Sequence, residues 1–473
     1  MSDAPPIPEP LWQTVPPEAQ EAIRARFESL ERRIADLEQR LNTNSTNSSK
    51  PPSSDPPSVK RRPPASPTGK KRGGQVGHRH HARALVPPEA LRQVIVRKPP
   101  RCRRCGHDLD GDDPAPLRHQ VAEVPPIQPV VDEYRLHRLR CPRCRTSTRA
   151  TLPPGVPAGG FGPRLRAILS VLAGAYRLGK RPIRQLASDL FGLSISTGMI
   201  CYLERQGSAE LEAPVEELRE HVRRADSGHI DETTWKQGHD RVWLWVAVTK
   251  LVTVFLIARS RGADVAKGML GTDARKVVIS DRLKSYNWVK RHQFCWAHLR
   301  RDFQAMIDRG GEAGEVGQRL MEHSDALFEW WHRVRDGTLA RSSFQTYVAT
   351  MRPFLKEDLE RGAACACSKT AGTCRELLAG ETHLWTFVRV EGVEPTNNDA
   401  ERALRHGVIY RKLSGGTASE AGSRFVERML SVVATCRQQD INVLGYLTRC
   451  YQAHLDGQPI PSLLPGSPRS EAA

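Results

Sequence analysis

The spacing of apolar residues changes period several times along the chain, and each change marks an expected structural unit. Apolar positions recur at helical spacing over 161–224 and again over 295–386. Between these blocks the pattern is that of β-strands, over 228–233, 242–248 and 251–257. The sequence therefore predicts a sheet that lies between two helical blocks.

A helix-like segment follows the third strand, and 276–280 then forms a buried fourth strand that ends directly in Asp281. Three meandering strands, a helix and a fourth strand make the opening of a ribonuclease-H-like α/β fold. Asp231 would lie on the first strand and Asp281 at the carboxyl end of the fourth, where ligands gather in α/β sheets. The run 384–390 is also strand-like, and a final helix is expected over 421–436.

The stretch 394–411 contains an Asn pair, a helix-forming run and one carboxylate, Glu401. Asn398 is a good N-cap, because its side chain can accept a hydrogen bond from the first helical turn. Glu401 and Arg405 are four residues apart and would meet as an ordinary surface ion pair. Glu401 could instead be a metal ligand together with Asp231 and Asp281, and the residues alone leave both interpretations open.

Two-metal phosphoryl transfer requires carboxylate oxygens that converge on two divalent cations. Asp231, Asp281 and Glu401 fit such a set, although spacing alone is a weak signal among 53 acidic residues. Strand alternation should point Glu232 to the opposite face from Asp231. The other acidic candidates near this set are Asp399, about 200° around the helix from Glu401, and Glu394 and Glu427.

The helical stretch 184–206 contains a helix, a turn at Gly192 and a second helix that Ser196 would cap. This spacing is typical of a DNA-binding helix-turn-helix, in which Arg184 would contact DNA. A plain helical hairpin is almost as well supported by these residues.

Two Cys-x2-Cys pairs, Cys102 with Cys105 and Cys141 with Cys144, favour one tetrahedral structural zinc ion. The gap of 35 residues between the pairs is longer than in compact fingers, but a β-ribbon would accommodate it. A redox pair is the weaker alternative. Three further thiols have no second pair at finger spacing and are interpreted as structural or incidental, not as a second zinc site: Cys365, Cys367 and Cys374.

Apolar residues at spacings of three and four over 23–41 predict a short coiled coil for self-association or a single amphipathic helix. The following residues, 42–83, are rich in Asn, Ser, Pro and basic residues and should form a disordered linker. The basic cluster of Lys70, Lys71 and Arg72 could follow DNA phosphates. The His tract at 78–81 is interpreted as solvated.

Composition narrows the class of partner. The chain has 71 Lys and Arg against 53 Asp and Glu, and its net charge of +18 favours a polyanion. No secretory signal pattern opens the sequence, and the most apolar stretch, 242–257, is too short to span a bilayer. With an odd count of 11 cysteines, we expect a cytoplasmic protein in a reducing compartment, with no membrane partner.

Four motifs in this order resemble the transposases of the bacterial insertion sequence 66 family (TnpC type): HIDETTW around Asp231, ISDRLKSYN around Asp281, CWAHLRRDF at 295–303 and EPTNNDAERALR around Glu401. The linker, the basic patch and the Cys pairs follow the family's order as well. The resemblance implies a DDE transposase with Asp231, Asp281 and Glu401 as its triad and two Mg²⁺ or Mn²⁺ ions as cofactors. The implied substrates are double-stranded DNA at element ends and at the target.

The resemblance also places Cys295 and His298 near the active site, in a supporting role. Further supporting residues and phosphate contacts are expected at Asn398, Arg402, Arg405 and Arg411. The protein should form a homo-oligomer, and accessory proteins of the same element would accompany it. A non-catalytic DNA-binding regulator and a nuclease without strand transfer remain the alternatives.

The expected organisation has six parts: an N-terminal coiled coil (1–45), a disordered basic linker (46–85), a zinc-ribbon domain (86–155), a helical, helix-turn-helix-like region (156–224), a ribonuclease-H-like catalytic domain (225–437, with a helical insertion at about 295–386) and a C-terminal segment and tail (438–473).

Overall fold

The computed structural model describes residues 12, 14–42 and 84–464. The basic cluster at 70–72 and the His tract therefore lie outside the described residues. No helix within the described part of the chain is long and apolar enough to cross a membrane.

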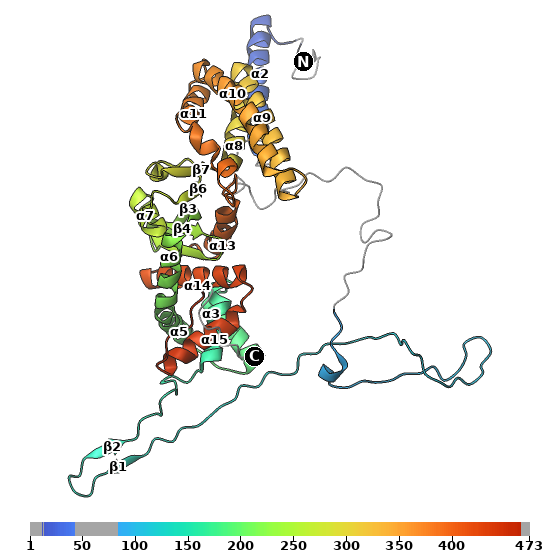
Figure 1. Ribbon diagram of the computed structural model, residues 1–473, viewed down its shortest axis with the longest axis vertical. Coiled ribbons are helices and arrows are strands. Elements are labelled where there is room, and N and C mark those ends of the chain that lie inside the picture. The colour runs from blue at the N-terminus through green and yellow to red at the C-terminus, as the bar shows by residue number, and fades with distance from the viewer. Residues whose placement is uncertain (1–11, 13, 43–83, 465–473) are drawn as a thin grey trace.

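A five-stranded mixed sheet occupies the centre of the molecule (Figure 1). Its strands are β3 (Ser227–Gln237), β4 (Asp240–Val248), β5 (Thr253–Ala258), β6 (Val277–Ser280) and β7 (Arg291–Phe294). The spatial order is β5-β4-β3-β6-β7; β4 is antiparallel to both of its neighbours, whereas β3, β6 and β7 are parallel. The helix α7 (Ala263–Leu270) connects β5 to β6. The predicted meander, helix and fourth strand are confirmed.

Two helices near the C-terminus pack on this sheet, α13 (Asn398–Ser414) over β3 and β4 and α14 (Glu420–Gln438) along β5. Gly407 lets α13 approach closely, since a Cβ atom there would lie 2.2 Å from Leu244 on β4. Trp245, the next residue on β4, contacts Tyr286 edge to face. Because strand side chains alternate, Tyr286 belongs to the opposite face of the sheet.

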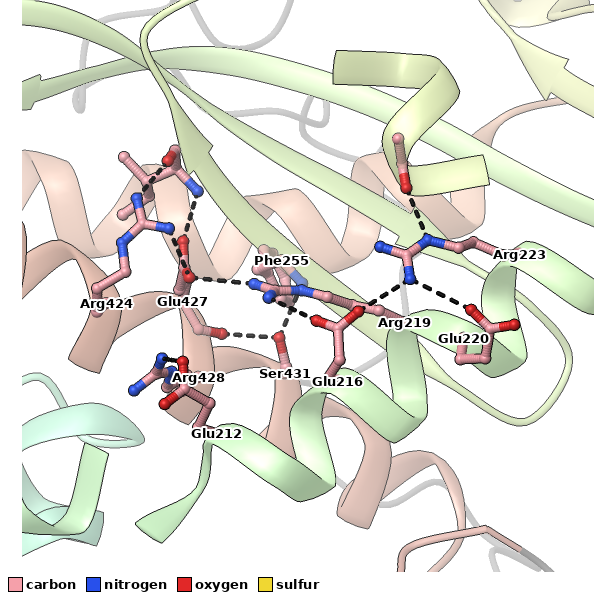
Figure 2. Close-up of polar contacts among 12 residues, drawn as sticks. Glu212, Glu216, Arg219, Glu220, Arg223, Phe255, Arg424, Glu427, Arg428 and Ser431 are labelled. Atoms are coloured by element: carbon pink, nitrogen blue, oxygen red, sulfur yellow. Dashed lines mark hydrogen bonds and ion pairs between the residues drawn. The ribbon is translucent and has the colours of Figure 1, made fainter. Parts of the chain in front are cut away.

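Side chains of α14 satisfy backbone donors on the edge strand β5 (Figure 2). The bonds run from the Ile257 amide to Glu427 Oε2 (2.8 Å), from the Phe255 amide to Ser431 Oγ (2.8 Å) and from the Thr253 amide to Thr435 Oγ1 (3.1 Å). Four residues of helix rise about 6 Å and two residues of strand about 6.6 Å, so the two spacings match. The exposed edge of the sheet is thereby covered by a helix.

A helical block lies between β7 and α13 and has a hydrophobic core of its own, which extends to β6 and β7. It contains α8 (Trp296–Ile307), α9 (Gly311–Arg335), α10 (Arg341–Ala364) and α11 (Ser368–Ala379). Figure 1 shows this block stacked at one end of the sheet. Cys374 is fully buried in it, as expected of a structural thiol.

The strand prediction for 384–390 is wrong, because this run forms the short helices η4 (Glu381–Leu384) and α12 (Thr386–Arg389). Its apolar residues are buried as a strand's would be, with Phe387 fully inaccessible. The Phe387 amide, however, donates to the side chain of Gln293 instead of to a strand. A short apolar run does not distinguish a buried strand from a buried helical turn.

The predicted helix, Gly192 turn and helix are confirmed as α4 (Lys180–Phe191) and α5 (Thr197–Glu210). Gly192 adopts a left-handed conformation (φ 64°), and Ser196 accepts from the Met199 amide at 3.1 Å. The pair packs with α3 (Pro163–Gly174) and is followed by α6 (Glu212–Arg224).

The C-terminal segment contains a helix that the sequence analysis missed, α15 (Val443–Leu455). It packs against α3 and α5, and the Tyr451 hydroxyl donates to Ser170 at 2.9 Å. A Cβ atom on Gly207 would lie 2.5 Å from that hydroxyl oxygen, so a larger residue would push α15 away. The described residues beyond α14 thus join the main core, and the rest of the predicted tail lies outside the described residues.

Near the N-terminus, α2 (Pro17–Asn42) is a single helix with exposed apolar side chains along its predicted seam. Residues 84–155 extend away from the body of the molecule and contain the small hairpin of β1 (Arg138–Arg140) and β2 (Ser147–Arg149) (Figure 1).

Candidate functional site

Two aspartates meet on neighbouring parallel strands. His229 of β3 pairs with Ile279 of β6, so Asp231 and Asp281, each two residues further on, lie level with one another. Asp231 Oδ1 accepts from the Glu232 amide at 2.8 Å, and Asp281 Oδ1 accepts from the Leu283 amide at 3.0 Å. The sequence analysis predicted both strand positions, and β6 ends at Ser280 as expected.

The third carboxylate comes from α13. Glu401 Oε1 lies 3.5 Å from His298 Nδ1 and 3.7 Å from Arg301 Nη2, both on α8. Of the two interpretations of Glu401, a direct ion pair with Arg405 is not found among the described residues: Glu401 lies against Arg301 of α8, and Arg405 acts on it through its charge. His298 and Arg301 are three residues apart and so share one face of α8. Arg301 was visible in CWAHLRRDF but was not singled out.

Burial is the largest cause of the shifted pKa in each of these three carboxyl groups. It raises the pKa of Asp231 well above its ordinary value, and the charges of Glu232, Asp281 and Glu401 raise it further. Burial also raises the pKa of Asp281 and of Glu401, whereas the nearby Arg301 lowers both. Half-buried carboxylates that repel one another are stabilised in their ionised form by a nearby cation.

Asn397 connects the elements that carry these groups. Its side-chain amide donates to the Ile230 carbonyl at 2.8 Å, and its Oδ1 lies 3.2 Å from His229 Nδ1. Its backbone amide donates to Cys295 Sγ at 3.1 Å, and its carbonyl accepts from the Glu401 amide at 3.1 Å. One buried residue thus links the strand of Asp231, the start of α8 and the first turn of α13.

The N-cap prediction was displaced by one residue. Asn398 is the first residue of α13 and is exposed, whereas Asn397 occupies the N-cap position. The Asn397 side chain makes no capping hydrogen bond because it is used in the contacts to β3. The Asn pair was the available sequence signal, but it did not show which member turns inward.

Cys295 and His298 lie at the start of α8, where the resemblance placed them beside the site. Cys295 is buried, and burial raises the pKa of its thiol to about 12. Burial, with the charges of Arg301 and Arg282, lowers the pKa of His298 to about 3. Cys295 Sγ, His298 Nδ1 and Glu401 Oε1 form a group whose ligand atoms all lie within 4.8 Å of one another. Oxygens of Asp231, Asp281 and Glu401 do not meet that distance in the described chain.

The other acidic candidates have other partners. Glu232 accepts from Arg261 Nε at 2.8 Å and from the Tyr286 hydroxyl, on the face opposite Asp231 as expected. Asp399 pairs with Arg402. Glu427 is buried against Arg219 and Arg424.

Glu394 lines a separate cavity of about 750 Å³ that extends between α13 and α14.

The predicted DNA contacts differ in their surroundings. Arg184 is exposed on α4, and Arg405 is exposed on α13. Arg402 is exposed but pairs with Asp399. Arg411 donates to Thr233 Oγ1 at 3.2 Å and to the Thr234 carbonyl, which ties α13 to β3.

The four cysteines of the predicted zinc site form two separate turns. In one, the Gly106 amide donates to the Cys102 carbonyl at 2.9 Å, and in the other the Arg145 amide donates to the Cys141 carbonyl at 2.9 Å. Hydrogen bonds involving Thr146 and Cys141 lower the pKa of Cys144 to about 7. Within the described ranges, no three of these thiols lie within 4.8 Å of one another. Each pair therefore has the local turn of a metal knuckle, without a shared site.

Comparison with known proteins identifies the relatives of this chain. Residues 159–424, more than half of the chain, match the model described as the Transposase IS66 family, and residues 7–84 match a family of unknown function (DUF6444). Two uncharacterized proteins of Sinorhizobium fredii, y4hP and y4qI, are each 23% identical to it. The y4hP alignment spans 75% of this chain and 70% of the relative, and the y4qI alignment 59% and 58%. The chain belongs to the IS66 transposase family.

Proposed function

We propose that this protein is a metal-dependent DNA transposase in which Asp231, Asp281 and Glu401 form the active site. The observation that carries the proposal is that three half-buried carboxyl groups from β3, the end of β6 and α13 act on one another through their charges, two of them level on adjacent strands. The strand order, with a central β3 and an antiparallel β4, supports the ribonuclease-H-like architecture expected from the sequence.

The residues present fit hard divalent cations. All three groups offer carboxylate oxygens, the ligands that Mg²⁺ and Mn²⁺ prefer, and Glu401 Oε1 is buried without a hydrogen-bond partner. Two such ions, when bound, would supply an activated hydroxyl nucleophile and stabilise the leaving 3′ oxygen. Asp231 and Asp281 would hold these ions, and Arg301 would balance charge beside Glu401.

The proposed reaction is phosphodiester hydrolysis at the element ends, followed by in-line attack of the freed 3′-OH on target DNA. The basic composition and the exposed Arg184 on α4 support binding of the ends by the helical region. The exposed apolar seam of α2 supports self-association of protomers.

The function is tested with the full-length protein, labelled end-sequence DNA and Mg²⁺. We expect nicked ends and joined products, both of which disappear when a chelator is added. Nicking without joining would favour the nuclease, and binding without either product would favour the regulator.

Asn397→Ala is expected to reduce cleavage by about a hundredfold, because a misplacement of about 1 Å in an active site has that effect. The substitution removes the hydrogen bonds to Ile230 and His229 that fix α13 against β3. DNA affinity, measured by fluorescence anisotropy, should be unchanged. Asn398→Ala is the matched control, since its side chain is exposed, and equal losses in the two variants would contradict the positioning role.

We also propose that Cys102, Cys105, Cys141 and Cys144 hold one structural zinc ion when both turns come together. Metal analysis should find about one Zn²⁺ per chain fewer in Cys102→Ser than in the parent. Cys201→Ser, which alters an exposed thiol outside the two pairs, is the control. Unchanged zinc content in Cys102→Ser would exclude the site.

A further inference from the structure

Two buried polar atoms beside the start of α8 have no hydrogen-bond partner, His298 Nδ1 and Glu401 Oε1. They lie 3.5 Å apart and face one another. Cys295 Sγ completes the group, within 4.8 Å of both atoms. Their contacts are longer ion pairs, with one another and, for Glu401 Oε1, with Arg301 Nη2 at 3.7 Å. Buried polar atoms without hydrogen bonds are costly, and their approach to a sulfur atom points to a ligand between them.

The fold holds these three atoms through two helix starts. Cys295 is the N-cap residue of α8, and the His298 amide donates to its carbonyl at 3.0 Å. The Asn397 amide donates to Cys295 Sγ at 3.1 Å, a bond that suits a thiolate bound to a metal. The positive end of the α8 dipole also favours a thiolate at this position. The Glu401 amide donates to the Asn397 carbonyl at 3.1 Å, so Asn397 holds both Cys295 and Glu401.

The chemistry of the donor set identifies the class of ion. One sulfur, one imidazole nitrogen and one carboxylate oxygen suit a borderline-soft divalent cation, whereas Mg²⁺ requires oxygen ligands. Three protein ligands would leave the fourth tetrahedral position open to water.

We propose that Cys295, His298 and Glu401 form a binding site for Zn²⁺, separate from the Mg²⁺ site expected at the aspartates. Because Glu401 belongs to both sets, Zn²⁺ held here would withdraw its carboxylate from Asp231 and Asp281. Zn²⁺ would therefore inhibit the Mg²⁺-dependent reaction. The inhibition rests on the proposed function, but the binding does not.

Co²⁺ is the probe for this site, because a cobalt–thiolate bond gives a charge-transfer absorption band. The full-length protein, stripped of metal, is titrated with Co²⁺ and compared with Cys295→Ser and His298→Ala. We expect each variant to bind about one ion per chain fewer than the parent. The Cys-x2-Cys pairs are unchanged in all three proteins, so the Co²⁺ that they bind is the same in each. Cys374→Ser, another fully buried thiol, is the control and should match the parent.

Equal Co²⁺ uptake by the parent and His298→Ala would overturn the proposal, even if Cys295→Ser failed to fold. Asp231→Asn should retain the ion, since Asp231 is not among its ligands. If the parent protein binds Co²⁺ at this site but cleaves no DNA, the metal site stands and the transposase proposal is refuted. The two proposals can therefore fail separately.

Discussion

Replacing Asp231 with Asn is expected to abolish both cleavage and joining of end DNA, with a loss of at least about a thousandfold. The carboxylate is the central metal ligand in the proposed site, and a ligand of this kind stabilises the transition state by several kcal/mol. Each 1.4 kcal/mol lost from that stabilisation slows the reaction about tenfold. Asn has nearly the same shape, so the loss would report the missing charge. Product formation in Mg²⁺ is measured on denaturing gels.

The same variant should unfold at an equal or higher temperature than the parent. Asp231 is buried beside the charges of Glu232, Asp281 and Glu401, so removing its charge relieves repulsion. Glu232→Gln is the matched control: it changes the adjacent carboxylate, which faces Arg261 and Tyr286, and should retain activity below its unfolding temperature. Retained activity in Asp231→Asn would refute the proposed triad.

Replacing Glu427 with Ala is expected to lower the free energy of unfolding by about 3–5 kcal/mol. The change removes the buried carboxylate that Arg219 and Arg424 share, and it also removes the acceptor of the Ile257 amide. Figure 2 shows this network between α6, α14 and β5. Urea unfolding followed by tryptophan fluorescence measures the change.

Glu216→Ala is the control for that prediction. Glu216 also contacts Arg219, at 3.2 Å, but its side chain is 51% exposed. A pair so exposed contributes at most about 1 kcal/mol. If both variants lost the same free energy of unfolding, the loss in Glu427→Ala could not be attributed to the attachment of α14 to the edge strand β5.

Much of the fold could be predicted from the sequence because the sheet pattern is local. The strands over 228–257 alternate or run apolar between turn residues, and the fourth strand ends in Asp281. The run 384–390 could not be assigned correctly, since its partners, including Gln293, are distant in the sequence. The helix α15 was missed because it is stabilised by packing against α3 and α5, and periodicity alone does not reveal such long-range contacts.

The candidate site was predictable to a different extent for each residue. Asp231 and Asp281 follow from strand positions, but Glu401 required the family resemblance, because 120 residues and a helical block separate it from Asp281. Its contact with Arg301 depends on how α8 meets α13. The role of Asn397 depends on the same contact, so neither could be derived from local pattern.

The central claim is that Asp231, Asp281 and Glu401 share one divalent-metal site. With hydrogen peroxide as oxidant and ascorbate to regenerate the ion, Fe²⁺ bound in place of Mg²⁺ generates hydroxyl radicals that cut the backbone nearby, and the fragment ends can be mapped by mass spectrometry. The account predicts cuts beside all three residues in the DNA-bound protein. Excess Mg²⁺ should suppress all of these cuts at the same concentration. Cuts near Asp231 and Asp281 without any near Glu401 would contradict it.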